Sequence, residues 1–452
     1  MDEPKPVLHG AHMQWLTKDG RYLTFKQVTE EKAAAEEVEQ TNNVDVEQGD
    51  EDMADEDRIE TQGNALDDDF LMDMPEIPMP DEDAKDVDVV EDEVDVAFKL
   101  AFVGIGQGGG RIAESFYKLG YRRVCCINTN TQDLTGINIP EANKLVMDIG
   151  DGGAGKDMAK GDSATKKYHE DVYDIMRKSF GRDFDRIMVC VGSGGGTGSG
   201  GCQHVIDIAH EIATSLKAEG DGTPPAVGVI VSLPKVTEGG KVNANAHAVL
   251  DGLFRRVGTD KGKLAGRDIS PLVIIDNDKI DQIYPNLPVA KFWDVANKNI
   301  SSLFHLFNSI ACKDSDFTTF DRADLKDVLE CGVLTFGACP LRKWESATDI
   351  SHAIRDNLRR NVLVGGFDLS HAKAAACVFI ASGDVLDVVP QSYLEHGFEM
   401  LTRIMHSGSV VHRSIYKATK PGLMVYTIMA ELSRPSERIE EIARIGGIKL
   451  GK

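Results

Sequence analysis

Apolar and polar residues follow one another in blocks along the chain, and the period of each block predicts its secondary structure. The run Ile-Met-Val-Cys-Val at 187–191 is a continuous apolar stretch of strand length. Glycine, serine and threonine fill 192–200, and apolar residues then recur at helical spacing from Val205 to Leu216. A flexible glycine linker is disfavoured, because a strand and an amphipathic helix directly flank the glycine-rich segment 192–200. The order predicts an anion site, because glycines let the backbone approach a ligand and the helix start has free N–H groups.

The same alternation of strands and helices continues on both sides of this unit. Strands are expected at 98–103, 123–127, 226–233 and 272–275, and helices at 111–119, 163–179, 241–256 and 291–311. From about 318 a second series follows, with helices at 322–330, 346–360 and 390–405, strands at 332–338, 374–380 and 423–430, and a frayed helix and tail over 433–452. We therefore expect an α/β fold. In this fold we expect a doubly wound, Rossmann-like parallel sheet, joined by a long central helix to a smaller α+β domain.

The pattern differs before residue 97. Residues 7–28 hold two alternating stretches around Asp19-Gly20, a strong hairpin signal. Residues 29–96 are acidic and poor in aromatics, which predicts disorder. An apolar island at 70–80 is either a chance patch or a short peptide that docks on a protein adaptor. The expected domains are 1–28 (hairpin or arm), 29–96 (disordered), 97–290 (nucleotide-binding), 291–312 (central helix), 313–432 (C-terminal) and 433–452 (tail).

Charge and cysteine usage narrow the class of protein. The formal net charge is −23, but 28 acidic and three basic residues lie between Glu30 and Asp95, so the remainder is close to neutral. The expected folded part thus gives no argument for nucleic acid, and none is predicted as a partner. Eight cysteines without zinc-site spacing indicate free thiols in a reducing compartment. No signal core or long apolar span is present, so we expect a cytoplasmic protein without membrane insertion.

Two further glycine-rich loops can be compared with known phosphate motifs. Gly104-x-Gly106-x-x-Gly109 follows a strand, as in dinucleotide-binding folds, but the next strand ends without the acid that would hold the ribose. An NAD-dependent oxidoreductase therefore stays only as a remote alternative. The run 150–156 resembles a P-loop, but Asp157 stands where a hydroxyl should hold magnesium. Three such loops along one sheet favour a long polyphosphate, bound mainly by backbone amides.

The sequence Gly-Gly-Gly-Thr-Gly-Ser-Gly at 194–200 is the signature loop of the tubulin/FtsZ family. The chain resembles this family over about 98–432, with the motifs in the same order, and it is more similar to bacterial FtsZ than to eukaryotic tubulin. Its departures fit a divergent or phage-borne member. The resemblance implies a GTPase that binds GTP or GDP with Mg²⁺, no residue being assigned to the metal.

The resemblance also assigns individual residues to the nucleotide. The implied contacts are Gly106, Gln107, Gly108, Gly109, Asn128, Gly153, Ala154, Gly155, Gly194, Gly195, Gly196, Thr197, Gly198, Glu238, Asn277, Trp293 and Asn297. The glycine loops would hold the phosphates, with 153–155 at the γ-phosphate, and Glu238 the ribose. Asn277 and Asn297 would contact the guanine, on which Trp293 would stack. Two positions depart from the family: Asn130 replaces an aspartate, and Val242 replaces an arginine, with Lys241 beside it.

Asp321 and Asp324 match the catalytic loop of the family. Their spacing lets both face one way at a helix start, although a helix cap and a first-turn acid would have the same spacing. The resemblance implies that they polarise water in the site of a neighbouring copy, so that hydrolysis needs a head-to-tail homopolymer. Thr319 stands where FtsZ has an asparagine, and this replacement would slow hydrolysis. The alternative is a non-catalytic, GTP-bound scaffold that forms filaments.

Overall fold

The computed structural model describes residues 5–9, 12–16, 22–23, 92–150, 152–219, 224–257, 269–284, 288–342, 344–359, 361, 363–405 and 409–449. The chain divides into two units, 1–63 and 64–452, and each is described by itself. The expected acidic segment lies outside the described residues as far as position 91, and so does its apolar island at 70–80.

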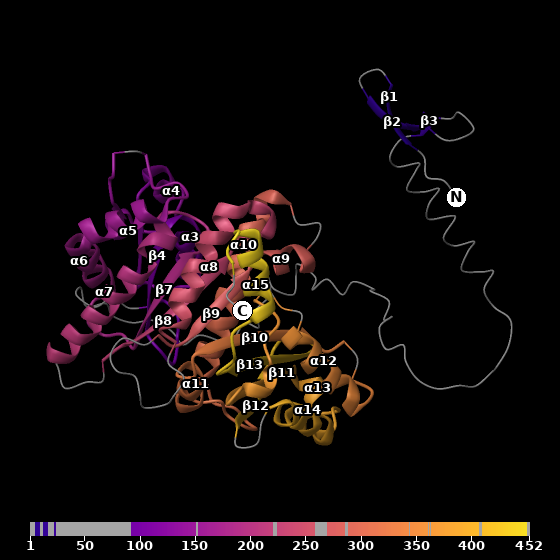
Figure 1. Ribbon diagram of the computed structural model, residues 1–452. Helices are drawn as coiled ribbons and strands as arrows, with labels where there is room; N and C mark the ends of the chain where they lie inside the picture. Colours follow the sequence, from indigo (N-terminus) through magenta and orange to yellow (C-terminus); the bar gives the residue numbers. More distant parts are fainter. Residues whose placement is uncertain are drawn as a thin grey trace. The chain divides into compact units, whose positions relative to one another are not determined.

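The first unit contains a small antiparallel sheet in the order β1-β2-β3 (Figure 1). Its strands are β1 (Lys5–His9), β2 (His12–Leu16) and β3 (Tyr22–Leu23). The pairing of Leu16 with Tyr22 agrees with the hairpin expected around Asp19-Gly20. Strand β1 was not expected, because Pro6 argues against a strand; the structure places β1 at the sheet edge, where a proline is tolerated.

The second unit is built on a ten-stranded sheet in the order β12-β11-β13-β10-β9-β8-β7-β4-β5-β6 (Figure 1). Strands β4 to β9 pair in parallel and are called here the parallel half. They are β4 (Leu100–Ile105), β5 (Val124–Asn128), β6 (Lys144–Val146), β7 (Arg186–Gly192), β8 (Ala226–Leu233) and β9 (Leu272–Asp276). The expected doubly wound α/β sheet is confirmed.

Helices cover both faces of the parallel half, which explains its almost continuous apolar strands. In β4, Ala101, Val103 and Ile105 belong to the core formed with helices α5 to α8. Leu100 and Phe102 belong to the opposite core, formed with helices α3, α10 and α11. Successive strand residues therefore serve two separate hydrophobic cores.

The helices of the second unit depart from expectation at several places. They are α3 (Gly106–Lys118), α4 (Thr131–Thr135), α5 (Met158–Lys167), α6 (His169–Phe180), α7 (Thr197–Glu219), α8 (Gly240–Phe254), α9 (Asn277–Ile283), α10 (Val289–Ile310), α11 (Arg322–Leu329), α12 (Ala347–Arg359), α13 (Gly383–Leu386), α14 (Gln391–Ile404) and α15 (Ser436–Ile445). The single helix expected over 163–179 is two helices. The first begins earlier, because the side chain of Asp157 accepts the Ala159 N–H and caps α5.

The remaining strands form the mixed half of the sheet. They are β10 (Val333–Pro340), β11 (Ala374–Ser382), β12 (Val410–Ala418) and β13 (Leu423–Ala430). Strand β13 runs antiparallel to β10 and β11, and β10 continues the sheet through a short parallel pairing with β9. Strand β12 was missed in the sequence, because an edge strand rich in polar and exposed positions has little apolar signal.

The last residues of the acidic segment are ordered against this unit. The carboxylate of Asp92 accepts a hydrogen bond from Arg123 Nη1 at 2.8 Å, and both side chains are buried. A second bond joins Asp92 to the Arg122 N–H. Residues 92–96, expected to be disordered, are thus held by a buried ion pair between residues 31 positions apart, which no local pattern indicates.

All eight cysteines are thiols outside any disulfide, and six of them are buried. Burial raises the pKa of Cys126 and of Cys202 to about 12, which keeps these thiols protonated and unreactive. Within the described residues, no helix has both the length and the apolar character needed to cross a membrane.

His305 of α10 makes the stability of the fold depend on pH. Burial, and then the charge of Lys313, lower the pKa of its imidazole from 6.5 to about 4. The unfolded chain therefore takes up the proton first as the pH falls, so stability is complete above pH 6.5 and is lost towards pH 4. Replacement of His305 by phenylalanine should remove about 2 kcal/mol of the stability loss between pH 6.5 and pH 5.

Urea unfolding at several pH values would measure this slope. Equal slopes for the wild type and the His305 variant would contradict the assignment.

Candidate nucleotide site

The order in which the strands of the parallel half are added switches direction at β4, with β5 and β6 on one side of it and β7, β8 and β9 on the other. Strand β4 pairs with β5 on one side and with β7 on the other. In open α/β sheets, ligands bind in the crevice outside the carboxyl ends of the strands at such a point. Helix α3 begins directly after β4, and α7 follows β7 after a short loop, so two helix starts meet at this edge.

Both helix starts leave their first N–H groups for an anion. The residue before α3, Ile105, offers no side-chain cap, and the first turns of α3 and α7 contain no acidic residue. These N–H groups have no acceptor within their helices. Helix α4, by contrast, is capped by Asn130 and has Asp133 in its first turn. The electrostatics therefore favour a phosphate group at α3 and α7 rather than at α4.

Glycines bring the two loops into direct backbone contact. A Cβ on Gly106 would lie 3.1 Å from the Gly198 nitrogen, and one on Gly108 would lie 3.2 Å from the Gly192 Cα. A Cβ on Gly109 would overlap the carbonyl oxygen of Cys190. The expected loops at 104–110 and 192–200 are thus packed against each other, and only glycine allows this spacing.

The third loop, 152–157, is joined to the other two by hydrogen bonds. The Gly196 N–H donates to the Gly155 carbonyl oxygen at 2.7 Å. The Thr129 hydroxyl accepts the Ala154 N–H at 2.9 Å and lies 2.6 Å from the Thr197 hydroxyl. Positive φ angles at Gly152, Gly153 and Gly155 let this loop fold over the helix start. The three glycine loops therefore form one structure.

Part of this structure is lined only by backbone. A Cβ added to Gly152, Gly155 or Gly195 would meet nothing within 4 Å, so these residues border open space. Asn245 Nδ2 holds the wall behind them by donating to the carbonyl oxygens of Lys156 and Gly194 at 3.0 and 3.1 Å. An exposed, backbone-lined loop surface next to two helix starts without acidic residues fits a polyphosphate.

Polar side chains gather where β5 ends. Asp133 accepts hydrogen bonds from Gln107 Nε2 and Asn128 Nδ2, both at 3.2 Å. Asn130 accepts two N–H groups of α4, and its Nδ2 donates to the Gly152 carbonyl oxygen at 2.7 Å. An aspartate could not make that donation, which gives a physical reason for asparagine at this position. Asn128 and Gln107 thus lie together around Asp133.

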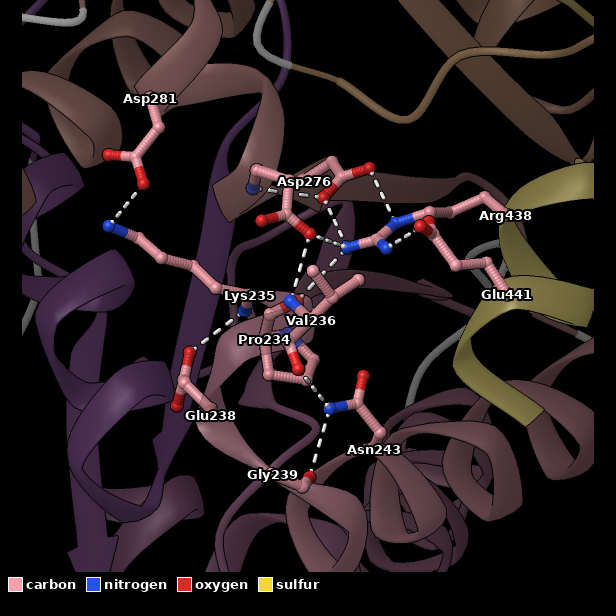
Figure 2. Close-up of polar contacts among 11 residues, drawn as sticks. Pro234, Lys235, Val236, Glu238, Gly239, Asn243, Asp276, Asp281, Arg438 and Glu441 are labelled. Carbon is pink, nitrogen blue, oxygen red and sulfur yellow. Dashed lines mark hydrogen bonds and ion pairs between the residues drawn. The ribbon is translucent and has the colours of Figure 1, made fainter. Parts of the chain in front are cut away.

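The segment after β8 is held by a dense polar network (Figure 2). The exposed Glu238 accepts the Lys235 N–H at 2.9 Å, and Lys235 Nζ pairs with Asp281 at 2.6 Å. Asn243 Nδ2 donates to the Gly239 carbonyl oxygen at 3.0 Å. Val242 is buried against Gly194, where a Cβ would come within 2.5 Å of its Cγ1. Val242 therefore packs on the signature loop.

The residues expected at the base come from two helices. Asn277 is the first residue of α9 and is buried, and Asn297 is buried in α10. Trp293 is part of helix α10, but the structure does not describe its side chain. Asn277 follows directly on Asp276 at the end of β9, which places it at the same edge as the glycine loops.

Asp321 and Asp324 lie at the opposite edge of the sheet. Arg322 between them bonds the Ala97 carbonyl oxygen and Asp185 Oδ1, just before β4 and β7 begin. Strand β4 has six residues, roughly 20 Å of extended chain, between this edge and Gly106. Figure 1 shows α11 below the parallel strands and α4 above them. One chain therefore does not bring these acids to its own glycine loops.

Both acids have structural partners where they stand. Asp321 Oδ1 accepts the N–H groups of Ala323 and Asp324, and Asp324 Oδ2 accepts the Asp321 N–H, which makes a capping box. Asp324 Oδ1 also pairs with His412 Nδ1 at 2.7 Å. The helix cap considered in the sequence is thus present, and it leaves Asp321 exposed.

Three side chains of this arrangement were missed in the sequence: Asn245, His412 and Arg438. Arg438 of α15 donates to both carboxylate oxygens of Asp276 at 2.9 Å (Figure 2). Burial raises the pKa of Asp276, and the charge of Arg438 opposes that shift. The sequence around Arg438 does not indicate this role, because its partner Asp276 is 162 residues away along the chain.

Comparison with known proteins agrees with this geometry. Residues 99–253 match the model of the GTPase domain of the Tubulin/FtsZ family. The tubulin-like protein TubZ of Bacillus cereus is 25% identical over 279 residues, which cover 58% of this chain and 59% of that protein. Cell division protein FtsZ 1 of Thermococcus kodakarensis is 25% identical over 203 residues, 44% of this chain and 47% of its own length. The matches thus span about half the length of these relatives.

A solved structure supports the fold over a longer stretch. The crystal structure of a GTPγS-form protofilament of Bacillus thuringiensis serovar israelensis TubZ superposes with a TM-score of 0.67. It is 19% identical and covers 78% of this chain and 92% of the TubZ chain. The similarity shows that the fold extends beyond the matched domain.

Proposed function

Because residues 99–253 belong to the tubulin/FtsZ family as its GTPase domain, we propose that this chain binds GTP and hydrolyses it in a head-to-tail filament of its own copies. The observation that carries the proposal is the placement of two half-sites at opposite edges of one sheet. The glycine loops follow β4 and β7, and Asp321 precedes α11 beyond the other ends of these strands. Stacking copies in one direction would bring the two halves together.

In this proposal the glycine loops hold the phosphates through backbone N–H groups. Gly106 to Gly109 and Gly194 to Gly198 supply the helix starts, and Gly153 to Gly155 close over the γ-phosphate. Glu238 holds the ribose, and Asn277 and Asn297 hydrogen-bond the guanine, on which Trp293 stacks. The support is the shared edge of the loops and of Asn277, together with the open space next to Gly152, Gly155 and Gly195.

The polar side chains at the end of β5 fit Mg²⁺. Within the described residues no cluster of three His, Cys, Asp or Glu side chains could hold a metal ion. Mg²⁺ commonly takes one or two carboxylates, with phosphate oxygens and waters as its other ligands. Asp133 would hold it, oriented by its bonds to Gln107 and Asn128. When bound, the ion offsets phosphate charge.

Asp321 and Asp324 of the adjacent copy orient the attacking water. The water attacks the γ-phosphorus, the bond from that phosphorus to the β–γ bridging oxygen breaks, and GDP and phosphate leave. Asp321 is exposed and is the more accessible of the two. Asp324 is partly occupied by His412 and by the cap of α11, so it mainly positions this loop.

GTP turnover per subunit, measured against total protein concentration, tests the proposal. A shared site predicts almost no turnover below a threshold concentration and a steep rise above it, with filaments in electron micrographs above the same threshold. Turnover per subunit that is constant down to the lowest concentration would overturn the shared site. Binding of NAD in preference to GTP would overturn the nucleotide assignment and favour the oxidoreductase.

One observation supports a second candidate, a GTP-bound scaffold without hydrolysis. The capping box and His412 provide a complete structural reason for the two acids. A scaffold predicts filaments that form with GTP and persist, with no phosphate release at any protein concentration.

A further inference from the structure

Helix α15 lies outside the matched family domain and yet packs on it. Its residues Ile442 and Ala443 are fully buried. At its end, a Cβ on Gly446 would come within 2.9 Å of the Ala244 nitrogen, so the last turn of α15 touches the backbone of α8. Figure 2 shows α15 entering the network around Pro234 and Asp276 from one side. This packing brings a distant part of the chain next to the ribose and base side of the candidate site.

From this position Arg438 reaches the ends of two strands. Its Nε and Nη2 donate to the two carboxylate oxygens of Asp276 at 2.9 Å, at the end of β9. Nη2 also donates to the Pro234 carbonyl oxygen at 3.1 Å, just after β8, and to Asp278 Oδ2 at 2.5 Å. The side chain of Arg438 is 9% exposed and that of Asp276 3%. A planar guanidinium can make this fork with a carboxylate, and an ammonium cannot.

The acceptors of Arg438 flank the residues assigned to the nucleotide. Asp276 and Asp278 lie on either side of Asn277 in the sequence, and Pro234 starts the segment that leads to Glu238. Asp278 Oδ2 accepts the Val236 N–H at 3.0 Å as well, so the two segments share a partner with the guanidinium. Arg438 therefore sets the distance between the ribose-side segment and the base-side asparagine.

We infer that Arg438 is a positioning residue of the nucleotide site, which rests on the proposed function. It holds Asn277 and the 234–238 segment at the spacing that a guanine nucleoside requires, without touching the nucleotide. Loss of its guanidinium would break the fork to Asp276 and leave the Pro234 carbonyl without this donor. Where the charge is lost as well, Asp276 would also stay buried without its counter-ion and close to Asp278. The strand ends would then separate, while the phosphate loops after β4 and β7 would keep their own packing.

The test uses the full chain, with Arg438→Lys and Arg438→Met compared with Arg434→Met. Arg434 precedes α15, pairs with Asp251 at 3.5 Å and lies over the Phe254 ring, so it ties the same region to α8 away from the site. Affinity for GDP and for ADP is measured at concentrations below the polymerisation threshold, together with the thermal midpoint. At higher concentration, KM and kcat for GTP are measured.

The inference predicts that both Arg438 variants bind GDP at least tenfold more weakly and that their preference for GDP over ADP falls by a similar factor. KM should rise while kcat changes less than threefold, because the phosphate loops and acids are not altered. Arg434→Met should keep the wild-type affinity and preference. A lower thermal midpoint with an unchanged GDP-to-ADP preference in Arg438→Lys, the milder variant, would overturn the inference. A wild-type protein that binds no GDP would instead overturn the proposed function.

Discussion

Replacement of Asp321 by asparagine is expected to lower GTP turnover in filaments by a factor of about 10² to 10³ while leaving GDP binding by the monomer unchanged. Asparagine is as good a helix cap as aspartate, so the bonds from Ala323 and Asp324 to the side chain remain and only the charge is lost. Phosphate release above the polymerisation threshold is the measurement.

Asp349→Asn is the control for the loss of a negative charge at a helix start. Asp349 Oδ2 accepts the Ser346 N–H at 2.9 Å at the start of α12, the role that Asp324 has at α11, but in a helix that the proposal does not involve. Its turnover should equal that of the wild type. Equal turnover in Asp321→Asn would contradict a catalytic role for Asp321 and leave the helix cap as its function.

A mixing experiment extends the test to the shared site. The Asp321→Asn protein keeps an intact nucleotide side, and a variant impaired in nucleotide binding keeps intact acids. Mixed filaments should contain some junctions that join the two intact halves. Turnover in the mixture should therefore exceed the sum of the two proteins measured alone, and a strictly additive result would contradict a site completed by a neighbour.

Replacement of Gly109 by alanine is expected to destabilise the fold by about 3 kcal/mol or more, at the upper end for overpacked cores. The new Cβ would overlap the Cys190 carbonyl oxygen and lie 2.8 Å from the carbonyl carbon. Both belong to the backbone of the central strand β7, so α3 would have to move away from the sheet. The midpoint of urea unfolding measures the loss, and a wild-type midpoint would show that α3 does not pack so closely.

Gly195→Ala is the control in the same set of loops. A Cβ there meets nothing within 4 Å, so the unfolding midpoint should stay within experimental error of the wild type. Its methyl group would enter the open space assigned to the phosphates, so GDP affinity should fall at least tenfold. The pair thus separates a glycine required for packing from one required for the ligand.

Local patterns in the sequence were sufficient for the elements of the parallel half. Continuous apolar runs predicted β4, β7, β8 and β9, because strands buried on both faces have little choice of composition. The glycine loops were recognisable because close backbone contact excludes every other residue. The early start of α5 depends on a helix cap, and the edge strand β12 depends on its neighbour in the sheet. Neither could be predicted from a local pattern.

The sequence by itself determined the fold class, the resemblance of residues 99–253 to the tubulin/FtsZ GTPase domain and the positions of the glycine loops. These follow from periodicity and from residues adjacent in the chain, where the physical constraint is local. Only the tertiary structure decided that Asp321 lies a strand length away from the glycine loops of its own chain, that Asp324 pairs with His412, and that Arg438 joins the ends of β8 and β9. Each of these depends on contacts between segments far apart in sequence, and such contacts are set by how the layers pack and leave no periodic signal.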